Sequence, residues 1–245
     1  MLAADGTQLR GIVFKGLTLM GGGDHEITAS LVESNVTGSR RSHYDAAGGF
    51  LIDLQAGLDI SGTRPMVITL TSCFVTSNEG SGIRFNVPGG QLNLVNSHVS
   101  ANKHFGNGGG IRVISGGLML SGSAVLNNVA EGVGSSGGGI SFEGSADKLH
   151  IHSLSTVMGN QATLHGGGLY VVSAQGALIM SGTGLLSNQA AQVGGGLYAL
   201  VQTATLEDCL VFDNQAGVHG GGLALEQLAG TVWLGTVVVR LNRKS

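Results

Sequence analysis

Short runs in which apolar and polar residues alternate recur along the whole chain, separated by turn residues. One recurring pattern is a small residue, any residue, Val or Leu, two further residues and Asn, as in Ser97 to Asn102. Its copies end at Asn35, Asn78, Asn102, Asn128, Asn160, Asn188, Asn214 and Asn242. Because successive side chains of a strand point to opposite faces, alternation over a few residues predicts strands.

Two further elements share this period. An alternating aliphatic pair such as Leu118 and Leu120 precedes most copies, and a glycine cluster with an aliphatic residue, such as Gly166 to Leu169, follows them. Successive Asn residues lie 24 to 32 residues apart after a first interval of 43. Stacking one copy per coil buries the inward Leu, Val and Ile as continuous ladders. The sequence therefore predicts an all-β, right-handed parallel β-helix (a solenoid) of about eight three-strand coils, forming a single domain over residues 1–245.

The recurring Asn and Gly have a structural interpretation. Asn tolerates the left-handed turn conformation, and its amide is both donor and acceptor, so Asn residues on successive coils can form a hydrogen-bonded ladder. Glycine triplets permit positive φ where the chain turns toward the next strand. A phosphate-binding glycine loop would instead lead into a helix, and no helical pattern follows these triplets.

Composition narrows the classes of protein. The 245 residues include 44 Gly, with 42 % hydrophobic and only 11 % charged residues, so the chain has material for a core and a surface built mainly from uncharged polar groups. A net charge of −3 with scattered Lys and Arg argues against a nucleic-acid partner. No apolar run is long enough to span a membrane. The first residues do not have the profile of a signal peptide, and we expect the chain to begin downstream of one.

The glycine–aliphatic motif, paired with Val or Leu three residues before Asn, resembles the repeats of polymorphic outer-membrane proteins of chlamydial type. The resemblance covers roughly Ser30 to Asn242. It implies the β-helical passenger domain of an autotransporter adhesin on the cell surface. The chain departs from that pattern in three ways. It has Gly at a position where the family often has Ala, and it has Val or Leu at a position where Phe is typical. It also shows no barrel-forming segment.

A carbohydrate-active enzyme of this fold needs two or three carboxylates that converge on one sheet. The acidic residues Asp53, Asp59, Glu143, Asp208 and Asp213 do not fall on equivalent positions of adjacent coils. We therefore predict no catalytic residue and no cofactor.

Histidine and cysteine suggest no metal site or disulfide. His150 and His152 point to the same side of one strand but have no third ligand nearby in the repeat, while His165 and His219 lie two coils apart. Cys73 and Cys209 occupy the same repeat position five coils apart, too far for a disulfide. We expect them to be small buried replacements for Ser or Thr.

The long first interval holds about fifteen extra residues, which we assign to turns at Val36–Asp45 and Ala56–Pro65. Insertions in a solenoid form loops, often on its binding face. These two contain Arg40, Arg41, His43, Tyr44 and Arg64, which we take as candidates for contacting glycans or acidic partners; solvated loop charges are the alternative. Asn35 also begins a glycosylation sequon, but as a repeat position it is expected to point inward.

These patterns favour a non-catalytic β-helical module of a surface or extracellular protein that serves adhesion, acts as a stalk or presents an interaction surface to a protein or glycan partner. One alternative is a polysaccharide lyase or glycoside hydrolase. Another is a structural subunit that stacks end to end in a fibre or large complex. Because no capping element is evident, we expect end-to-end association or a longer parent chain.

Overall fold

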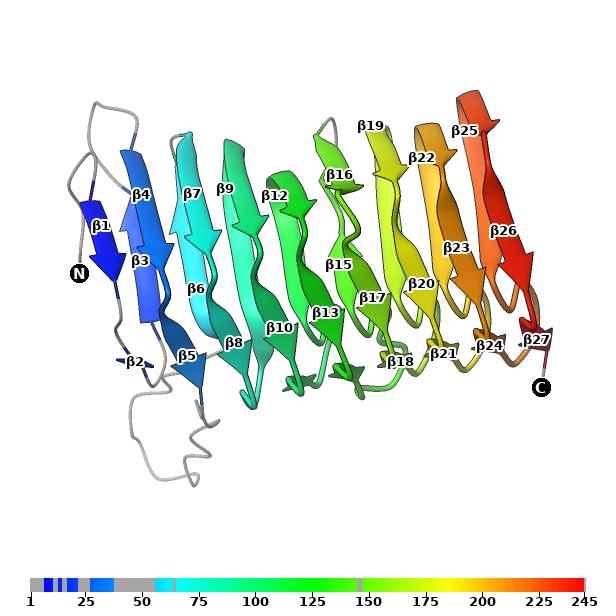
Figure 1. Ribbon diagram of the computed structural model, residues 1–245, viewed down its shortest axis with the longest axis horizontal. Coiled ribbons are helices and arrows are strands. Elements are labelled where there is room, and N and C mark those ends of the chain that lie inside the picture. The colour runs from blue at the N-terminus through cyan, green and yellow to red at the C-terminus, as the bar shows by residue number, and fades with distance from the viewer. Residues whose placement is uncertain are drawn as a thin grey trace.

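The computed structural model describes residues 7–10, 13–14, 17–21, 27–37, 56–63, 65–144 and 147–244. In these residues every regular element is a strand, and every strand pairing is parallel. Strands that are equivalent in successive repeats lie side by side along the long axis of the molecule, with β1 and β27 at opposite ends (Figure 1). The chain is therefore a parallel β-solenoid, and its right-handed sense stays a prediction.

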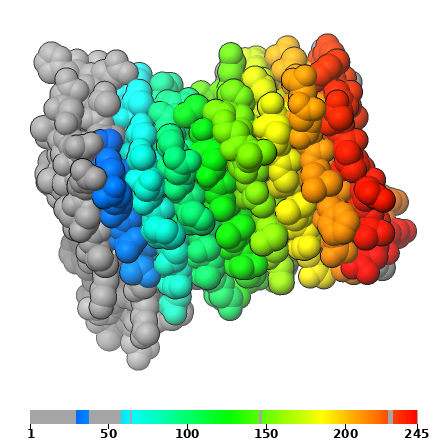
Figure 2. Space-filling view, in the orientation of Figure 1, coloured from blue at the N-terminus to red at the C-terminus, as the bar shows by residue number. Residues whose placement is uncertain are grey.

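Three sheets run along the solenoid. Over the described part of the chain, sheet 1 has 12 strands, sheet 2 has nine and sheet 3 has six, so six of these coils contribute to all three sheets. Packed together, the coils appear as parallel bands that follow one another along the long axis (Figure 2). The number of strands differs from sheet to sheet, so the predicted count of about eight coils stays a prediction.

The strands of sheet 1 are β1 (Thr7–Arg10), β3 (Leu17–Gly21), β4 (Ile27–Val32), β6 (Ala56–Gly62), β7 (Met66–Thr71), β9 (Ser81–Val95), β12 (Ile111–Ser121), β15 (Ile140–Phe142), β16 (Lys148–His152), β19 (Leu169–Ser181), β22 (Leu197–Glu207) and β25 (Leu223–Leu234). Those of sheet 2 are β2 (Val13–Phe14), β5 (Asn35–Thr37), β8 (Phe74–Thr76), β10 (His98–Ser100), β13 (Ala124–Leu126), β17 (Thr156–Met158), β20 (Gly184–Leu186), β23 (Cys209–Phe212) and β26 (Val237–Arg240). Sheet 3 consists of β11 (Lys103–His104), β14 (Val129–Ala130), β18 (Gln161–Ala162), β21 (Gln189–Ala190), β24 (Gln215–Ala216) and β27 (Arg243–Lys244).

We expected two separate strands in each repeat: one directly after the glycine cluster, and one that contains the alternating aliphatic pair. In β9, β12, β19, β22 and β25 they form one continuous strand of 11 to 15 residues. Register shifts at the middle of these strands, for example between Ser173 and Ala177 of β19, mark where each one bends. The two motifs therefore belong to the two halves of one long strand.

The core is built from inward ladders of aliphatic residues. Ile83, Ile111, Ile140, Leu169 and Leu197 are paired in register, and all are fully buried. A second ladder runs through sheet 2 at Val75, Val99, Val125, Val157, Leu185 and Val211. Since burying one such side chain contributes about 1.5–3 kcal/mol, these repeated ladders supply the main driving force for stacking the coils.

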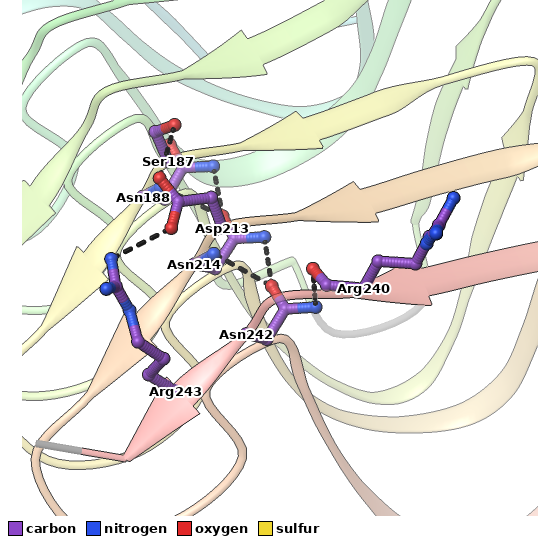
Figure 3. A network of polar contacts seen from close by, with 7 residues as sticks. All are labelled: Ser187, Asn188, Asp213, Asn214, Arg240, Asn242 and Arg243. Atoms are coloured by element: carbon purple, nitrogen blue, oxygen red, sulfur yellow. Dashed lines mark hydrogen bonds and ion pairs between the residues drawn. The ribbon is translucent and has the colours of Figure 1, made fainter.

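The predicted Asn ladder is confirmed from Asn78 to Asn242. Asn188 shows its geometry: the side-chain Nδ2 donates to Asn214 Oδ1 at 2.9 Å and to the carbonyl of Val157 in the preceding coil at 2.9 Å. The backbone N–H of Asn188 also donates to Asn214 Oδ1, and Asn214 is joined to Asn242 in the same way (Figure 3). Because both amide hydrogens and the oxygen are used, each internal Asn is satisfied without water.

Asn35 was wrongly placed in this ladder. Its strand β5 pairs in the register Asn35 to Phe74 and Val36 to Val75, so Asn35 is an outward residue of sheet 2 and its side chain is exposed. The repeat copy therefore begins at the buried Ser34, the equivalent of Cys73, and the position matching Asn78 is residue 39, outside the described residues. The sequon at Asn35 consequently has an exposed side chain, contrary to expectation.

The recurring Asn was expected to adopt the left-handed conformation at a turn. The residue before each ladder Asn adopts it instead, and we call each position in this conformation a left-handed corner. Most of the described coils have left-handed residues at three places: before the ladder Asn, before the small residue that begins the repeat, and at the first glycine of the triplet, the last as predicted. The first set has φ between 51° and 67° at Ser77, Ala101, Asn127, Gly159, Ser187, Asp213 and Leu241. The Asn itself is thereby left in an ordinary conformation with its amide directed inward.

One predicted insertion is wrong. Residues 56–62, expected in a turn, form β6, which pairs with β3 and β9 in sheet 1. Leu58 and Ile60 of this strand are fully buried, so they belong to the aliphatic ladders. Beyond β5, the other expected insertion lies outside the described residues.

Candidate functional site

The outward residue that follows the aliphatic position of each glycine motif forms a row across adjacent coils of sheet 1. We call this the Arg–Tyr row. It is paired residue by residue and consists of Asp59, Arg84, Arg112, Ser141, Tyr170 and Tyr198. Since paired strands lie about 4.8 Å apart, the row presents one side chain every coil along the solenoid axis.

The strand alternation explains the position of the row. The preceding residue in each coil, such as Ile111 or Leu169, points into the core, so Arg112 and Tyr170 must point outward. Apart from the fully buried Ser141, these side chains are half-buried, which leaves their polar ends at the surface.

The N-terminal half of the row carries two adjacent guanidinium groups. Arg84 Nη1 forms an ion pair with Asp59 Oδ1 at 2.9 Å. Arg112 lies beside Arg84 in the next coil, and within the described residues its side chain has no hydrogen bond or ion pair. The buried Nε atoms of both arginines lack a partner in this part of the chain.

The C-terminal half is a stack of aromatic rings. The rings of Tyr170 and Tyr198 are stacked with centroids 5.5 Å apart, and His165 stacks on Tyr198 at 5.0 Å. Burial raises the pKa of both phenols, with a further contribution from the charge of Glu143 at Tyr170 and of Glu226 at Tyr198. Burial also lowers the pKa of His165, and Glu226 partly opposes this shift. The stack is therefore uncharged near neutral pH.

Two carboxylates flank the row. Glu143 Oε1 accepts hydrogen bonds from Asn107 Nδ2 at 2.9 Å and from Ser141 Oγ at 2.8 Å. The strand register places Glu226 three coils further along, which corresponds to about 14 Å from the strand spacing. Paired carboxylates of glycosidases lie about 5–9.5 Å apart, so these two do not form such a pair.

The other acidic residues considered for catalysis are dispersed. Asp59 is paired with Arg84, while Asp208 and Asp213 occupy left-handed corners of sheet 2. Asp213 accepts from Arg243 Nη2 at 2.9 Å near the C-terminal end of the Asn ladder (Figure 3). Asp53 lies outside the described residues.

The predicted binding candidates Arg40, Arg41, His43, Tyr44 and Arg64 all lie outside the described residues. The structure therefore says nothing about the binding role predicted for their loops.

The histidines lie as the repeat predicts. The rings of His150 and His152 point to the same side of β16 with centroids 4.5 Å apart, and His165 and His219 are separated by Val193, which bridges to both. Over the part of the chain that the structure describes, no three His, Cys, Asp or Glu side chains gather in a way that could hold a metal ion.

Cys73 and Cys209 are buried free thiols at the start of their repeats, and burial raises the pKa of both. Their position belongs to a second polar ladder, in which the backbone N–H of Cys73 donates to Ser97 Oγ and that of Ser97 donates to Ser123 Oγ. The prediction that cysteine replaces Ser or Thr at a buried position is confirmed.

Sheet 3 carries a shallow groove of about 280 Å³. Its lining includes the outward side chains of Gln161 and Gln189, which are in register, together with Glu131 and Thr163. The ion pair between Lys103 Nζ and Glu131 Oε2 at 2.5 Å ties Glu131 to the neighbouring coil. This groove has polar amides but no unpaired charge, so it is a weaker candidate than the Arg–Tyr row.

Neither the Arg–Tyr row nor the groove was identified from the sequence. The available signal was the residue directly after each glycine–aliphatic motif, which reads Arg, Arg, Ser, Tyr and Tyr in five successive copies. The residues of the row lie one whole repeat apart in the sequence and so form no local cluster there. The charged residues of the long first interval do form such a cluster.

Comparisons with protein-family models, with curated proteins and with solved structures give no match. The class of protein is thus defined by fold alone, as a parallel β-solenoid, and the likeness to chlamydial-type outer-membrane repeats stays a prediction. None of the described elements is a helix that could cross a membrane.

Proposed function

We propose that this chain is a non-catalytic β-solenoid module of a surface or extracellular protein, and that the Arg–Tyr row is its binding surface. The observation that carries the proposal is the row itself: polar and aromatic side chains occupy one outward line over five consecutive strand pairings of one sheet.

A row with a constant step suits an extended ligand that lies along the solenoid axis. Every coil of the row except that of the buried Ser141 then offers one contact, and the backbone that presents it is fixed by parallel pairing and by the buried aliphatic residues beneath. Aromatic and Arg side chains are the types that dominate binding surfaces, and the aromatic ones lose little conformational freedom for a large contact.

The placement of the carboxylates favours binding over hydrolysis. Glu143 is held by Asn107 and Ser141, and Glu226 lies too far away to act with it as an acid–base pair. A carbohydrate-active enzyme remains the alternative, in which Glu143 would be the first residue to test.

The test uses affinity electrophoresis of the full chain in gels containing dextran, cellulose derivatives or polygalacturonate, together with a reducing-end assay. We expect retention by at least one polymer without release of new ends. Replacing both tyrosines, Tyr170→Ala with Tyr198→Ala, should weaken retention, whereas Phe74→Ala, an exposed aromatic residue of sheet 2, should leave it unchanged.

Product release that is lost in Glu143→Gln would identify an enzyme and overturn the proposal. Absence of retention by every polymer, or retention that ignores the tyrosine substitutions in a correctly folded variant, would also contradict it.

A further inference from the structure

The charges of the Arg–Tyr row are mismatched at its N-terminal half. Two guanidinium groups lie side by side at Arg84 and Arg112, yet within the described residues only one carboxylate, that of Asp59, pairs with them. Like charges directly opposite one another on paired strands are destabilising. Nothing in the core requires Arg at either position, because both side chains point outward.

The acidic group on the next coil does not form an ion pair with Arg112. Glu143 accepts from Asn107 and Ser141, and no ion pair joins it to Arg112 in the described part of the chain. Asn86, the next outward residue of β9, accepts from Ser115 Oγ at 2.8 Å through Oδ1. That bond leaves the Nδ2 hydrogens of Asn86 as further donors on the same face. Within the described residues Arg112 therefore keeps unpaired donors on this face.

A half-buried guanidinium with free donors is suited to a planar anion. Arg can hold a carboxylate or sulfate through two parallel hydrogen bonds, and such charge-assisted bonds are about twice as strong as neutral ones. Because the chain has a net charge of −3, general attraction cannot draw a polyanion to it. Binding would have to depend on this local pair.

The geometry separates two kinds of acidic ligand. An extended peptide places same-face side chains about 6.6–6.8 Å apart, which does not match a row that steps by about 4.8 Å. A linear uronic-acid polymer carries one carboxylate on every pyranose unit, and rotation about its glycosidic bonds sets the directions in which successive carboxylates point. Such a chain could place successive carboxylates at Arg84 and Arg112 and continue along Tyr170 and Tyr198.

We propose that Arg84 and Arg112 form a subsite for the carboxylates of an acidic polysaccharide that lies along the Arg–Tyr row. This inference rests on the proposed binding function and specifies the chemical class of its ligand.

The experiment measures the Kd of the full chain by isothermal titration with polygalacturonate, with neutral dextran and with poly-L-glutamate. Wild-type protein should bind polygalacturonate and lose affinity with added salt, since salt screens exposed charges. Hydrogen bonds to charged groups are worth about 1.5–3 kcal/mol, so Arg112→Gln should raise Kd by about tenfold or more. Arg112→Lys, which keeps the charge but not the two-pronged geometry, should show an intermediate loss.

Arg243→Gln is the matched control, because Arg243 is also a surface arginine but is paired with Asp213 on a different part of the solenoid. It should leave Kd unchanged. Circular dichroism and the unfolding midpoint of Arg112→Gln verify its fold, and we expect a midpoint equal to or above that of the wild type because a like-charge contact is removed.

The outcomes separate the two proposals. Binding of dextran that is unaffected by Arg112→Gln would overturn the acidic subsite while leaving the binding function intact. Poly-L-glutamate that binds as tightly as polygalacturonate would make the partner an acidic peptide and overturn the polysaccharide assignment. Absence of binding to every polysaccharide would contradict both proposals.

Discussion

Gly168 lies directly against the carboxamide of Asn188 in the next coil. A Cβ built on Gly168 would stand 2.9 Å from Asn188 Cγ and 2.6 Å from the carbonyl oxygen of Gly196. The same contact recurs at Gly110 with Asn128, Gly139 with Asn160, Gly196 with Asn214 and Gly222 with Asn242. The glycine motif and the Asn motif, which are separate in the sequence, therefore form one packing unit.

This contact predicts that Gly168→Ala destabilises the solenoid. The added methyl group would have to displace a ladder amide that is already fully hydrogen-bonded, and overpacking of this kind costs about 1–3 kcal/mol. The free energy of unfolding from urea titration is the measurement. Gly167→Ala should cost more, because its Cβ would meet the backbone of Gln189 at 2.3–2.6 Å, which cannot rotate away.

Gly184→Ala is the matched control for this pair. Gly184 also lies outside the left-handed region, and a Cβ there would contact only the side chain of Leu186 at 3.4–3.7 Å. We expect this variant to be neutral or slightly more stable, because Ala restricts the unfolded chain. Equal losses at positions 168 and 184 would show that the close contact with the ladder does not determine the requirement for glycine.

The Asn ladder predicts a large cost for Asn160→Ala. The substitution leaves the Nδ2 of Asn128, the carbonyl of Val125 and the Oδ1 of Asn188 each short of a buried partner. Since one unsatisfied buried group costs about 1–3 kcal/mol, the loss should reach about 3 kcal/mol unless water enters the gap. Asn35→Ala should change the free energy of unfolding by no more than about 0.5 kcal/mol, because Asn35 is exposed and outside the ladder.

The fold followed from the sequence because a solenoid repeats the same physical requirement in every coil. A buried Asn or an inward Val at one position implies its equivalents in the neighbouring coils, so eight imperfect copies support one another. The first copy failed because Ser30, Val32 and Asn35 match the pattern only by coincidence, and Asn35 is an outward residue of β5. The residues that set its true register, Ser34 and Val36, fit the same pattern shifted by four positions.

The candidate site was less accessible to sequence reasoning. Arg112 and Tyr170 are unremarkable in their own segments, and they become neighbours only after the coil register places them in one row. The missing partner of Arg112 is likewise a property of three-dimensional surroundings. The sequence pattern does not indicate which carboxylates already have an ion-pair or hydrogen-bond partner.

Ala101 offers a test of the left-handed corners. Its φ of 53° lies where a side chain with a Cβ is disfavoured, and the residue is exposed. Glycine avoids the cost of the left-handed conformation but gains conformational entropy in the unfolded chain, and the first effect is the larger. Ala101→Gly should therefore raise the free energy of unfolding by roughly 1 kcal/mol. Ser100→Gly, in the adjoining strand β10, should instead lower stability by about 0.5–1 kcal/mol. A loss at both positions would contradict the corner geometry.

The shifted pKa values predict that stability declines on both sides of neutral pH. Folding lowers the pKa of His165 and His150, chiefly by burial, below the ordinary value of 6.5. Below that pH the unfolded chain binds more protons than the folded chain, so stability falls as the pH drops through the folded values. Folding raises the pKa of Cys73 and Cys209 above 9.0 and of Tyr170 and Tyr198 above 10.0, again chiefly by burial.

On the alkaline side the unfolded chain loses its protons first, so stability falls as the pH rises above about 9. The free energy of unfolding, measured by urea titration from pH 4 to pH 11, should therefore be highest between about pH 6.5 and pH 9. His165→Gln should reduce the acid slope without changing the alkaline one. Tyr198→Phe should reduce the alkaline slope and leave the acid one in place, since phenylalanine keeps the ring stack but has no hydroxyl to ionise. If both slopes persist unchanged in the two variants, the buried aromatic stack does not control the pH dependence and other ionisable groups must do so.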